Sequence, residues 1–109
     1  MTDICIVGGS GLLGSSLIPY LRNSGFKVFC LSRKSGSSEH ELVDFQNQKS
    51  LEKILDVRSP KFIINLAALT DVAECEKNPQ VAYVANVKVV ESLSQWILKR
   101  KKCHLIHIS

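Results

Sequence analysis

The chain has 109 residues, of which 45% are hydrophobic, and a formal net charge of +4 at pH 7. This length predicts one domain with a core of its own, and the hydrophobic share is typical of a soluble globular chain. No apolar run approaches the roughly 20 residues that cross a bilayer, and the first residues read as a strand rather than a signal sequence, so we expect a cytoplasmic protein with no membrane partner.

The excess positive charge is concentrated in one run, Lys99-Arg100-Lys101-Lys102, where a long helix is expected to end. Cations at that position complement the negative end of the helix dipole. No aromatic residue interrupts the run and no second basic run supports it. We therefore favour a solvated helix end over a polyanion-binding patch and expect no nucleic-acid partner.

The cysteines and histidines do not suggest a metal site. Cys5, Cys30, Cys75 and Cys103 lack Cys-x-x-Cys spacing and lie mostly in apolar runs, so we expect buried free thiols. His104 and His107 lie three residues apart in the sequence, on a predicted strand, so their side chains point to opposite faces. For these histidines we favour hydrogen bonding near the strand end over catalysis, and we expect no metal.

The first predicted element is a short buried strand, Ile4–Val7, which runs into a glycine-rich turn. An apolar pattern with helical spacing then predicts a helix over Leu12–Asn23, with Pro19 inside it and Gly25 as its C-terminal cap. Glycines in the turn allow positive φ and close approach of a ligand, while the helix start presents free amides and a positive dipole to an anion. We interpret the turn as a dinucleotide phosphate site rather than a purely structural turn. The residues expected to bind are Gly8, Ser10, Gly11, Leu12, Leu13 and Gly14.

The rest of the chain alternates predicted strands with predicted helices. The strands are expected at 26–31, 41–43, 61–66 and 104–109, and a surface loop at 32–40. A helix capped by Ser50 should reach Val57, with Leu51, Ile54 and Leu55 on its inner face, and Pro60 should prevent its continuation. A longer helix should begin at Pro79 after Asn78 and end near Lys101. Its packing stripe comprises Val81, Ala85, Val89, Leu93 and Ile97, with Trp96 at the edge. This alternation predicts an α/β fold of the Rossmann type, with a doubly wound parallel sheet of order 3-2-1-4-5 that is incomplete at its C-terminal side.

Three further positions at strand ends are candidate cofactor contacts. The second predicted strand is followed by Ser32, Arg33 and Lys34 rather than by an acidic residue, and an arginine there can hold a 2′-phosphate, so we favour NADP over NAD. The alternative is that these are ordinary loop charges. Asp44 and Phe45 follow the third strand and could address the adenine. After the fourth strand, small residues allow the backbone to pass close to a cofactor, at Leu66, Ala67, Ala68 and Thr70.

These motifs together resemble the extended short-chain dehydrogenase/reductase superfamily, and most of all the dTDP-4-dehydrorhamnose reductase family. The resemblance is carried by Gly8-x-x-Gly11-x-x-Gly14, Asp44-Phe45, Asn65-Leu66-Ala67-Ala68, Asn78-Pro79, Tyr83-x-x-Asn86 and His107-Ile108-Ser109. It covers the whole chain but only about the first third of a family member. The resemblance implies NADPH- or NADH-dependent reduction of the 4-keto group of a nucleotide-activated deoxysugar.

The chain departs from that family at the catalytic residues. The family uses a tyrosine with a lysine four positions later, whereas Tyr20 and Tyr83 are followed at that spacing by Ser24 and Val87. We therefore assign no catalytic residue here. Residues 1–109 are expected to be the N-terminal cofactor-binding part of a longer enzyme, inactive alone, whose missing part binds the nucleotide sugar; homo-oligomer formation is left open. The alternatives are an NAD-dependent nucleotide-sugar epimerase or dehydratase, and a non-catalytic NADP-binding regulatory subunit.

Overall fold

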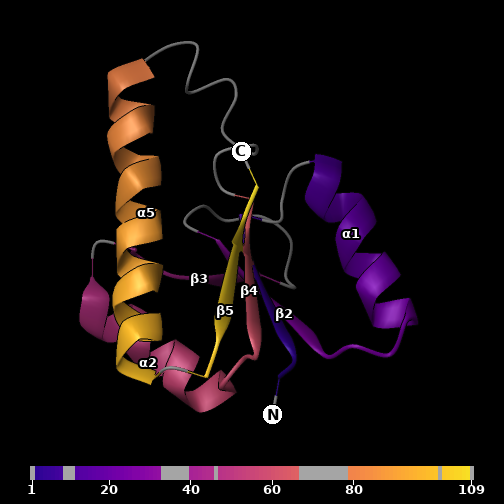
Figure 1. Ribbon diagram of the computed structural model, residues 1–109. Helices are drawn as coiled ribbons and strands as arrows, with labels where there is room; N and C mark the ends of the chain where they lie inside the picture. The colour runs from indigo at the N-terminus through magenta and orange to yellow at the C-terminus, as the bar shows by residue number, and fades with distance from the viewer. Residues whose placement is uncertain are drawn as a thin grey trace.

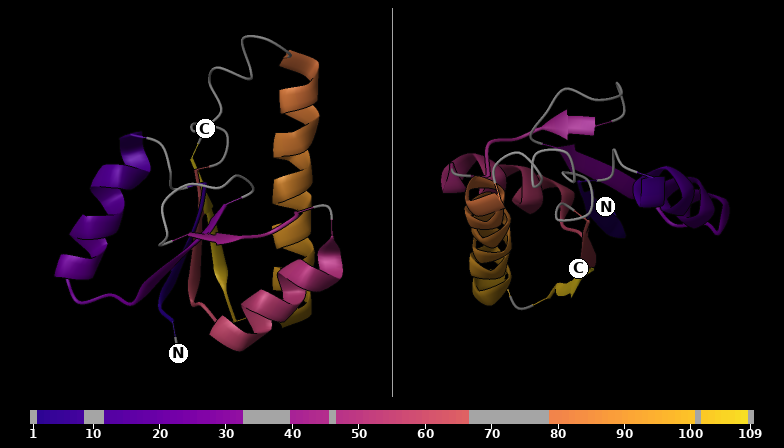
Figure 2. Two further views of the ribbon diagram at one scale, coloured as in Figure 1. Left: turned by 180° about the vertical axis from the view of Figure 1, so that it is seen from behind. Right: turned by 90° about the horizontal axis from the view of Figure 1, so that it is seen from above.

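The computed structural model describes residues 2–8, 12–32, 40–45, 47–66, 79–100 and 102–108, with the side chains of 12, 40 and 79–86 outside that description. These residues form a five-stranded sheet of order β3-β2-β1-β4-β5 with helices on both faces (Figures 1 and 2). All four strand pairings are parallel. The predicted α/β class and strand order are confirmed. The elements are β1 (Ile4–Val7), α1 (Leu12–Asn23), β2 (Val28–Ser32), β3 (His40–Leu42), α2 (Gln48–Arg58), β4 (Phe62–Asn65), α5 (Pro79–Arg100) and β5 (His104–His107).

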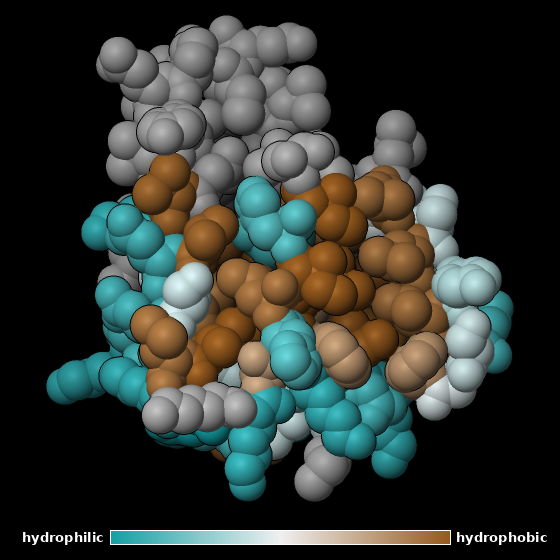
Figure 3. Space-filling model, viewed as in Figure 1, coloured by the Kyte–Doolittle hydropathy of each residue, from teal (hydrophilic) through white to brown (hydrophobic). Residues whose placement is uncertain are grey.

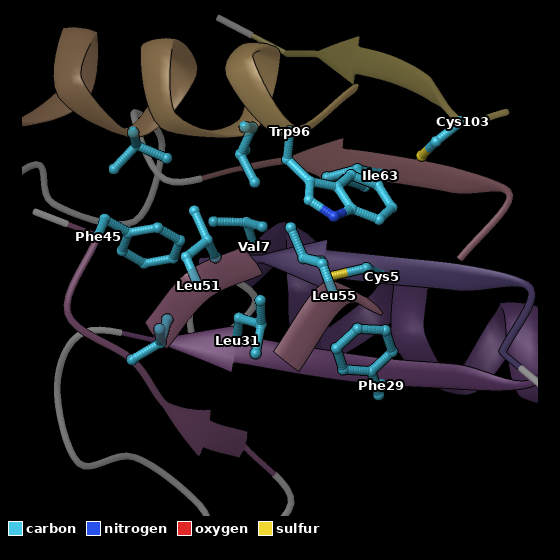
Figure 4. Close-up of a cluster of buried hydrophobic side chains, with 13 residues drawn as sticks. Cys5, Val7, Phe29, Leu31, Phe45, Leu51, Leu55, Ile63, Trp96 and Cys103 are labelled. Carbon is cyan, nitrogen blue, oxygen red and sulfur yellow. The ribbon is translucent and has the colours of Figure 1, made fainter. Parts of the chain in front are cut away.

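Alternation along the strands divides the core into two hydrophobic clusters, one on each face of the sheet. In β1, Cys5 and Val7 belong to the cluster beneath α2 and α5, whereas Ile4 and Ile6 belong to the cluster beneath α1. Figure 4 shows the first cluster, into which α2 contributes Leu51 and Leu55. A strand that is apolar on both faces is the expected pattern for the centre of a parallel sheet.

The two faces are covered unequally. Viewed from above in Figure 2, α2 and α5 lie on one side of the sheet and α1 lies on the other. On the α1 side, Phe62 of β4 and Ile106 of β5 keep 39% and 44% of their surface exposed. Figure 3 shows apolar side chains gathered between α5 and α1, on the side of the molecule where β5 lies. The parallel sheet therefore has one face that helices cover well and one face that they cover only in part.

Helix α1 ends in a two-bond C-terminal cap. Phe26 N–H donates to Leu21 O and Gly25 N–H donates to Arg22 O, both at 3.1 Å, which is the Schellman pattern. Gly25 has φ of 96°, a value that a residue with a β-carbon adopts only with strain. The predicted cap is confirmed. Because the Phe26 amide serves this cap and the Lys27 amide donates to the Asp3 carboxylate at 2.9 Å, β2 begins at Val28, two residues later than predicted.

The prediction of Ser50 as the cap of α2 is wrong. The helix begins at Gln48, and its N-cap is Asn47, whose Oδ1 accepts the Ser50 N–H at 3.2 Å. An N-cap side chain satisfies an amide two or three residues into the helix, so Ser50 is the donor in this cap. The predicted inner face is confirmed, with Leu51 and Leu55 buried and Ile54 partly buried.

Other predicted boundaries differ by one or two residues. Strand β3 spans 40–42 rather than 41–43, although Val43 N–H continues the ladder by donating to Ser32 O at 2.9 Å. Strand β4 spans 62–65 and β5 spans 104–107, each shorter than predicted. Of the α5 stripe, Val89 and Leu93 are buried, Ile97 is partly buried and Trp96 is buried beside them. Asn78, Lys101, Ser109 and the side chains of Val81 and Ala85 lie outside the described residues.

The sequence predicts a solvated basic end for α5, but the structure shows that two of its cations also form charge pairs. Arg100 donates to both carboxylate oxygens of Asp56, and Lys99 Nζ lies 3.0 Å from Glu52 Oε2, so two cations of α5 pair with two carboxylates of α2. The Arg100 guanidinium, aided by the Trp96 indole N–H, lowers the pKa of Asp56. Hydrogen bonds from Gln48 and then from Lys99 lower the pKa of Glu52. The two helices are therefore joined by charge pairs as well as by apolar packing.

The described cysteines are free and buried, as predicted for Cys5, Cys30 and Cys103. Cys75 lies outside the described residues. Burial raises the pKa of Cys5 well above its ordinary value. Among the described helices, none combines the length and the apolar character needed to cross a membrane.

Candidate functional site at the carboxyl edge of the sheet

The carboxyl ends of β1, β2 and β4 meet at one edge of the sheet. Gly8 N–H donates to Leu31 O at 3.0 Å, and Leu66 N–H donates to Val7 O at 2.8 Å. Strand β1 therefore has β2 on one side and β4 on the other, and the chain order reverses at this point. In doubly wound sheets, ligands bind in the crevice outside the carboxyl ends of the strands at such a reversal.

Gly8 turns the chain out of β1 with φ of 74°, in the left-handed region where glycine is favoured. Helix α1 begins four residues later, and its N-terminal end lies at the same edge as the carboxyl ends of the strands (Figure 1). The helix contains no acidic residue over Leu12–Asn23, so no carboxylate on it opposes an anion. The positive end of its dipole favours negative charge.

The segment after β3 is fixed by backbone contacts. Phe45 has 5% of its surface exposed and packs in the hydrophobic cluster beneath α2 and α5, and Ser92 Oγ of α5 donates to its carbonyl at 2.8 Å. Asn47 N–H donates to Asp44 O at 2.9 Å, and the Asp44 side chain is exposed. Phe45 is therefore an anchor that holds Asp44 at the edge.

Ser92 was not predicted. It lies on α5 between Val89 and Trp96, at helical spacing with the buried stripe, and only 7% of its surface is exposed. A small hydroxyl on an apolar helix face is the signal that could have indicated a buried hydrogen bond. Gln48 Nε2 also donates to Ser92 O at 3.0 Å, so α2, α5 and the segment after β3 meet at this serine.

The structure describes about half of the predicted cofactor contacts. Gly14 is buried in the first turn of α1, Leu13 is exposed, and Ser32 and Leu66 are buried at the ends of β2 and β4. Leu66 packs in the cluster beneath α1, so its side chain belongs to the core. Leu12 is described in its backbone alone. Their contacts with a cofactor stay a prediction. The predicted contacts outside the described residues are Ser10, Gly11, Arg33, Lys34, Ala67, Ala68 and Thr70.

A buried amide and a histidine pair across the ends of β4 and β5. Asn65 Nδ2 lies 3.1 Å from His107 Nδ1, and Asn65 has 1% of its surface exposed. An amide nitrogen is a donor only, so His107 Nδ1 is the acceptor in this pair. The predicted hydrogen bonding of His107 near the strand end is confirmed. His104, on the opposite face, stacks on Phe62 with ring centroids 5.8 Å apart.

No group of three histidine, cysteine, aspartate or glutamate side chains that could hold a metal ion occurs within the residues that the structure describes. The carboxyl edge offers backbone amides, a helix N-terminus, an exposed aspartate and an imidazole. This set suits recognition of phosphate and hydroxyl groups.

A parallel sheet of order 3-2-1-4-5, with a positive-φ glycine leading from β1 toward the first helix, defines a protein of the Rossmann-type doubly wound class. Comparison with known proteins then identifies the family. The chain belongs to the RmlD substrate binding domain family, whose model matches residues 1–109.

Relatives and solved structures agree with this membership. The chain is 36% identical over 96 residues to GDP-6-deoxy-D-talose 4-dehydrogenase of Aggregatibacter actinomycetemcomitans. The alignment covers 87% of this chain and 30% of the relative. A crystal structure of a hypothetical dTDP-4-dehydrorhamnose reductase from Sulfolobus tokodaii has a TM-score of 0.79 at 30% identity, covering 98% of this chain and 38% of that one. The chain thus spans 30% to 38% of the length of these two proteins.

A third comparison shows the fold alone. UDP-glucose 4-epimerase from Bifidobacterium longum, solved in complex with NAD+ and UDP, has a TM-score of 0.83 at 19% identity. The match covers 99% of this chain and 37% of the epimerase. The two proteins therefore share the Rossmann-type fold.

Proposed function

We propose that residues 1–109 are the cofactor-binding part of an oxidoreductase that reduces the 4-keto group of a nucleotide-activated deoxysugar. Support comes from the family membership and from relatives that are named as a 4-dehydrogenase and as a hypothetical dTDP-4-dehydrorhamnose reductase. The chain spans about a third of these proteins, so the substrate and the complete activity belong to the proposal.

The observation that carries the proposal is the geometry around Gly8. A buried strand passes through a positive-φ glycine toward a helix without acidic residues, at the edge where the strand order reverses. This arrangement fits a dinucleotide pyrophosphate, because the backbone can approach the phosphates and the dipole of α1 stabilises their charge. A nicotinamide cofactor bound there would supply the hydride for the reduction.

NADP is the cofactor that we favour. Ser32 is the last residue of β2 and is buried at the carboxyl edge, so the sequence continues from that edge into Arg33 and Lys34. In this fold, the position after the second strand addresses the adenosine ribose. A guanidinium binds a 2′-phosphate with two hydrogen bonds, whereas an acidic residue would accept from the ribose hydroxyls of NAD.

We infer that the proton donor of the reaction is contributed by the longer protein. Tyr20 is exposed on α1 and has Ser24 four positions later, and Tyr83 has Val87 there, so neither forms the tyrosine–lysine pair expected of the family. In the longer protein, oxidation of NADPH should require a nucleotide-activated 4-keto-deoxysugar. The 109-residue chain alone should bind cofactor without supporting that reaction.

Titration of the 109-residue chain with NADPH and with NADH, followed by the fluorescence of the reduced nicotinamide, tests the proposal. NADPH should bind more tightly than NADH. Arg33→Ala should weaken the affinity for NADPH by about tenfold with little effect on the affinity for NADH, since a charged hydrogen bond to phosphate contributes about 1.5–3 kcal/mol. Lys61→Ala removes the same charge at the opposite edge of the sheet and should leave both affinities unchanged. The proposal fails if the folded chain binds neither cofactor, and the NADP preference fails if Arg33→Ala weakens both equally.

A further inference from the structure

The two edge strands of the sheet differ in the features that prevent pairing with another strand. Strand β3 is three residues long and carries Glu41, which pairs with Arg58 at the end of α2. Strand β5 spans His104–His107, contains no acidic residue, lysine, arginine or proline, and pairs with β4 in regular register along its whole length. Charged residues, proline and bulges are the usual means by which proteins keep a sheet edge from pairing. Strand β5 has none of these within its four residues.

The backbone of β5 uses alternate residues to bind β4. His104 N–H donates to Lys61 O at 3.0 Å, and Ile108 N–H donates to Asn65 O at 3.2 Å. Successive residues of a strand direct their backbone groups to opposite sides, so the N–H and C=O groups between these two positions, at residues 105 and 107, point away from β4. Among the described strands, β5 is the last in the sheet and has no neighbour on that side. Its free edge therefore presents two donors and two acceptors.

Ile106 lies at the centre of this free edge. Its side chain is on the α1 side of the sheet and has 44% of its surface exposed. An antiparallel copy of β5 centred on Ile106 would place Leu105 of one copy opposite His107 of the other as a hydrogen-bonded pair. The two Ile106 side chains would then lie directly opposite each other, at the position where the strands come closest. A β-branched pair at such a position stabilises strand pairing.

Helix α5 has an apolar flank on the same side as this edge. Viewed from above in Figure 2, α2 lies toward β3 and α5 lies toward β5, and α5 binds α2 through Trp96 and Lys99. At about 100° per residue, the opposite side of the helix carries Val87, Val90 and Leu98, which we call the outer flank of α5. Val87 and Leu98 have 37% and 72% of their surface exposed, and Val90 is partly buried. The outer flank therefore faces past β5 with apolar side chains.

We propose that this edge binds a second copy of residues 1–109, with the two β5 strands antiparallel about a two-fold axis at Ile106. Leu105 and His107 of each copy form four backbone hydrogen bonds across the axis, and the two sheets become one continuous sheet. The axis is perpendicular to the sheet, so the two α5 helices lie on the same face with their outer flanks toward each other. Two paired strands alone make a small interface, and the outer flanks add the apolar contact that a specific dimer requires.

Sedimentation equilibrium of the 109-residue chain measures the association. The apparent mass should rise from the monomer value of 12.1 kDa toward twice that value between about 10 µM and 1 mM, the range expected of a small interface. Amide hydrogen exchange followed by NMR locates the interface. The amides of Leu105 and His107 should exchange about fivefold more slowly at the upper concentration than at the lower one. The amide of Leu42, on the opposite edge strand, is the control and should not change.

Two substitutions at His107 separate the contribution of its backbone from that of its side chain. His107→Ala removes the imidazole and keeps the outward N–H, so the dimer should persist. His107→Pro also removes that N–H, and an edge strand tolerates proline where the missing N–H points outward. Because each dimer loses two hydrogen bonds, the dissociation constant of His107→Pro should be at least about tenfold higher than that of His107→Ala.

A charge at the two-fold axis tests the predicted register. Ile106→Lys brings two ammonium groups together and should weaken association by at least about tenfold. Leu42→Lys places the same charge on the opposite edge strand, at a side chain with 57% of its surface exposed, and should leave association unchanged. The dispersion of the amide spectrum checks that each variant is folded.

Three results would overturn the proposal. The first is a chain that stays monomeric at 1 mM, which would leave the edge to a strand of the longer protein. The second is a dimer in which the Leu105 and His107 amides exchange equally fast at all concentrations. The third is an equal dissociation constant for His107→Pro and His107→Ala.

Discussion

Arg100 donates from Nε and Nη2 to the two carboxylate oxygens of Asp56, at 2.7 and 2.8 Å, and so joins the last turn of α5 to α2. Trp96 donates to the same carboxylate from one turn earlier in α5. Asp56 therefore accepts three hydrogen bonds from one helix while belonging to another. An ionised carboxylate accepts such bonds best, which explains why its pKa is lowered.

The stability of the chain should accordingly depend on pH below the ordinary pKa of aspartate. The folded-state pKa of Asp56 lies below its ordinary value of 3.8, so the contribution of this group is present above that value and is lost as pH falls through the folded-state pKa. Urea midpoints measured between pH 5 and pH 2.5 should fall, and Asp56→Asn should make this fall shallower. Glu91→Gln, which alters an exposed pair with Lys88 within α5, is the control. Identical pH profiles for Asp56→Asn and the parent chain would contradict the assignment.

Gly25→Ala should destabilise the chain by about 1 kcal/mol, because a β-carbon at φ of 96° is strained. The added carbon would meet no atom within 4 Å, so the loss would come from the backbone alone. Gly25→Asn should lose less stability than Gly25→Ala, since asparagine tolerates the left-handed region better than alanine. Urea unfolding of both variants measures the difference, and equal losses would indicate that the conformation of Gly25 is not the cause.

Ser92→Ala should destabilise the chain by about 1 kcal/mol, since it leaves the buried Phe45 carbonyl without the hydroxyl that donates to it at 2.8 Å. The segment that holds Asp44 should then be less well fixed, and NADPH affinity should fall along with the free energy of unfolding. Ser94→Ala, a partly buried serine on the same helix, is the matched control for affinity. A loss of stability with unchanged NADPH affinity would show that the anchoring of Phe45 does not serve the site.

Cys103 should react slowly with iodoacetamide in the folded chain. Its pKa of about 11 leaves about one thiolate in a thousand thiols at pH 8, and only 7% of its surface is exposed. Unfolding in urea should restore the ordinary pKa and raise the alkylation rate more than tenfold. Mass spectrometry of the peptide that contains Cys103 measures this rate separately from the other cysteines. A similar rate in native buffer and in urea would contradict the burial of this thiol.

The fold could be predicted because its signals are local. The β-branched run of β1, the apolar spacing of α1 and Pro79 at the start of α5 each involve neighbours in sequence, and the structure has these elements where they were expected. The positions of Gly8, Ser32 and Leu66 at one edge follow from the same alternation of strands and helices. Boundaries were less certain, because the caps formed by Asn47 and Gly25 redirect individual amides.

The contacts between elements could not be predicted. Ser92 and Phe45 lie 47 positions apart, Arg100 and Asp56 lie 44 apart, and His107 and Asn65 lie 42 apart. Each pair depends on the register of packed helices or adjacent strands, and a sequence pattern does not fix that register to within one residue. A cavity beside Trp96 was missed for the same reason, since its lining comes from α2, from α5 and from the connections that follow these two helices.

The partly covered face of the sheet affects how strongly copies of the chain attract one another, and so how soluble the chain is. Phe62 and Ile106 favour attraction between copies, whereas the net charge of +4 opposes it. Salt screens the repulsion, and strongly hydrated anions such as sulfate strengthen the hydrophobic attraction. The chain should therefore be easiest to keep dispersed in dilute buffer of low ionic strength well below its isoelectric point of about 9.0, and should salt out readily in ammonium sulfate.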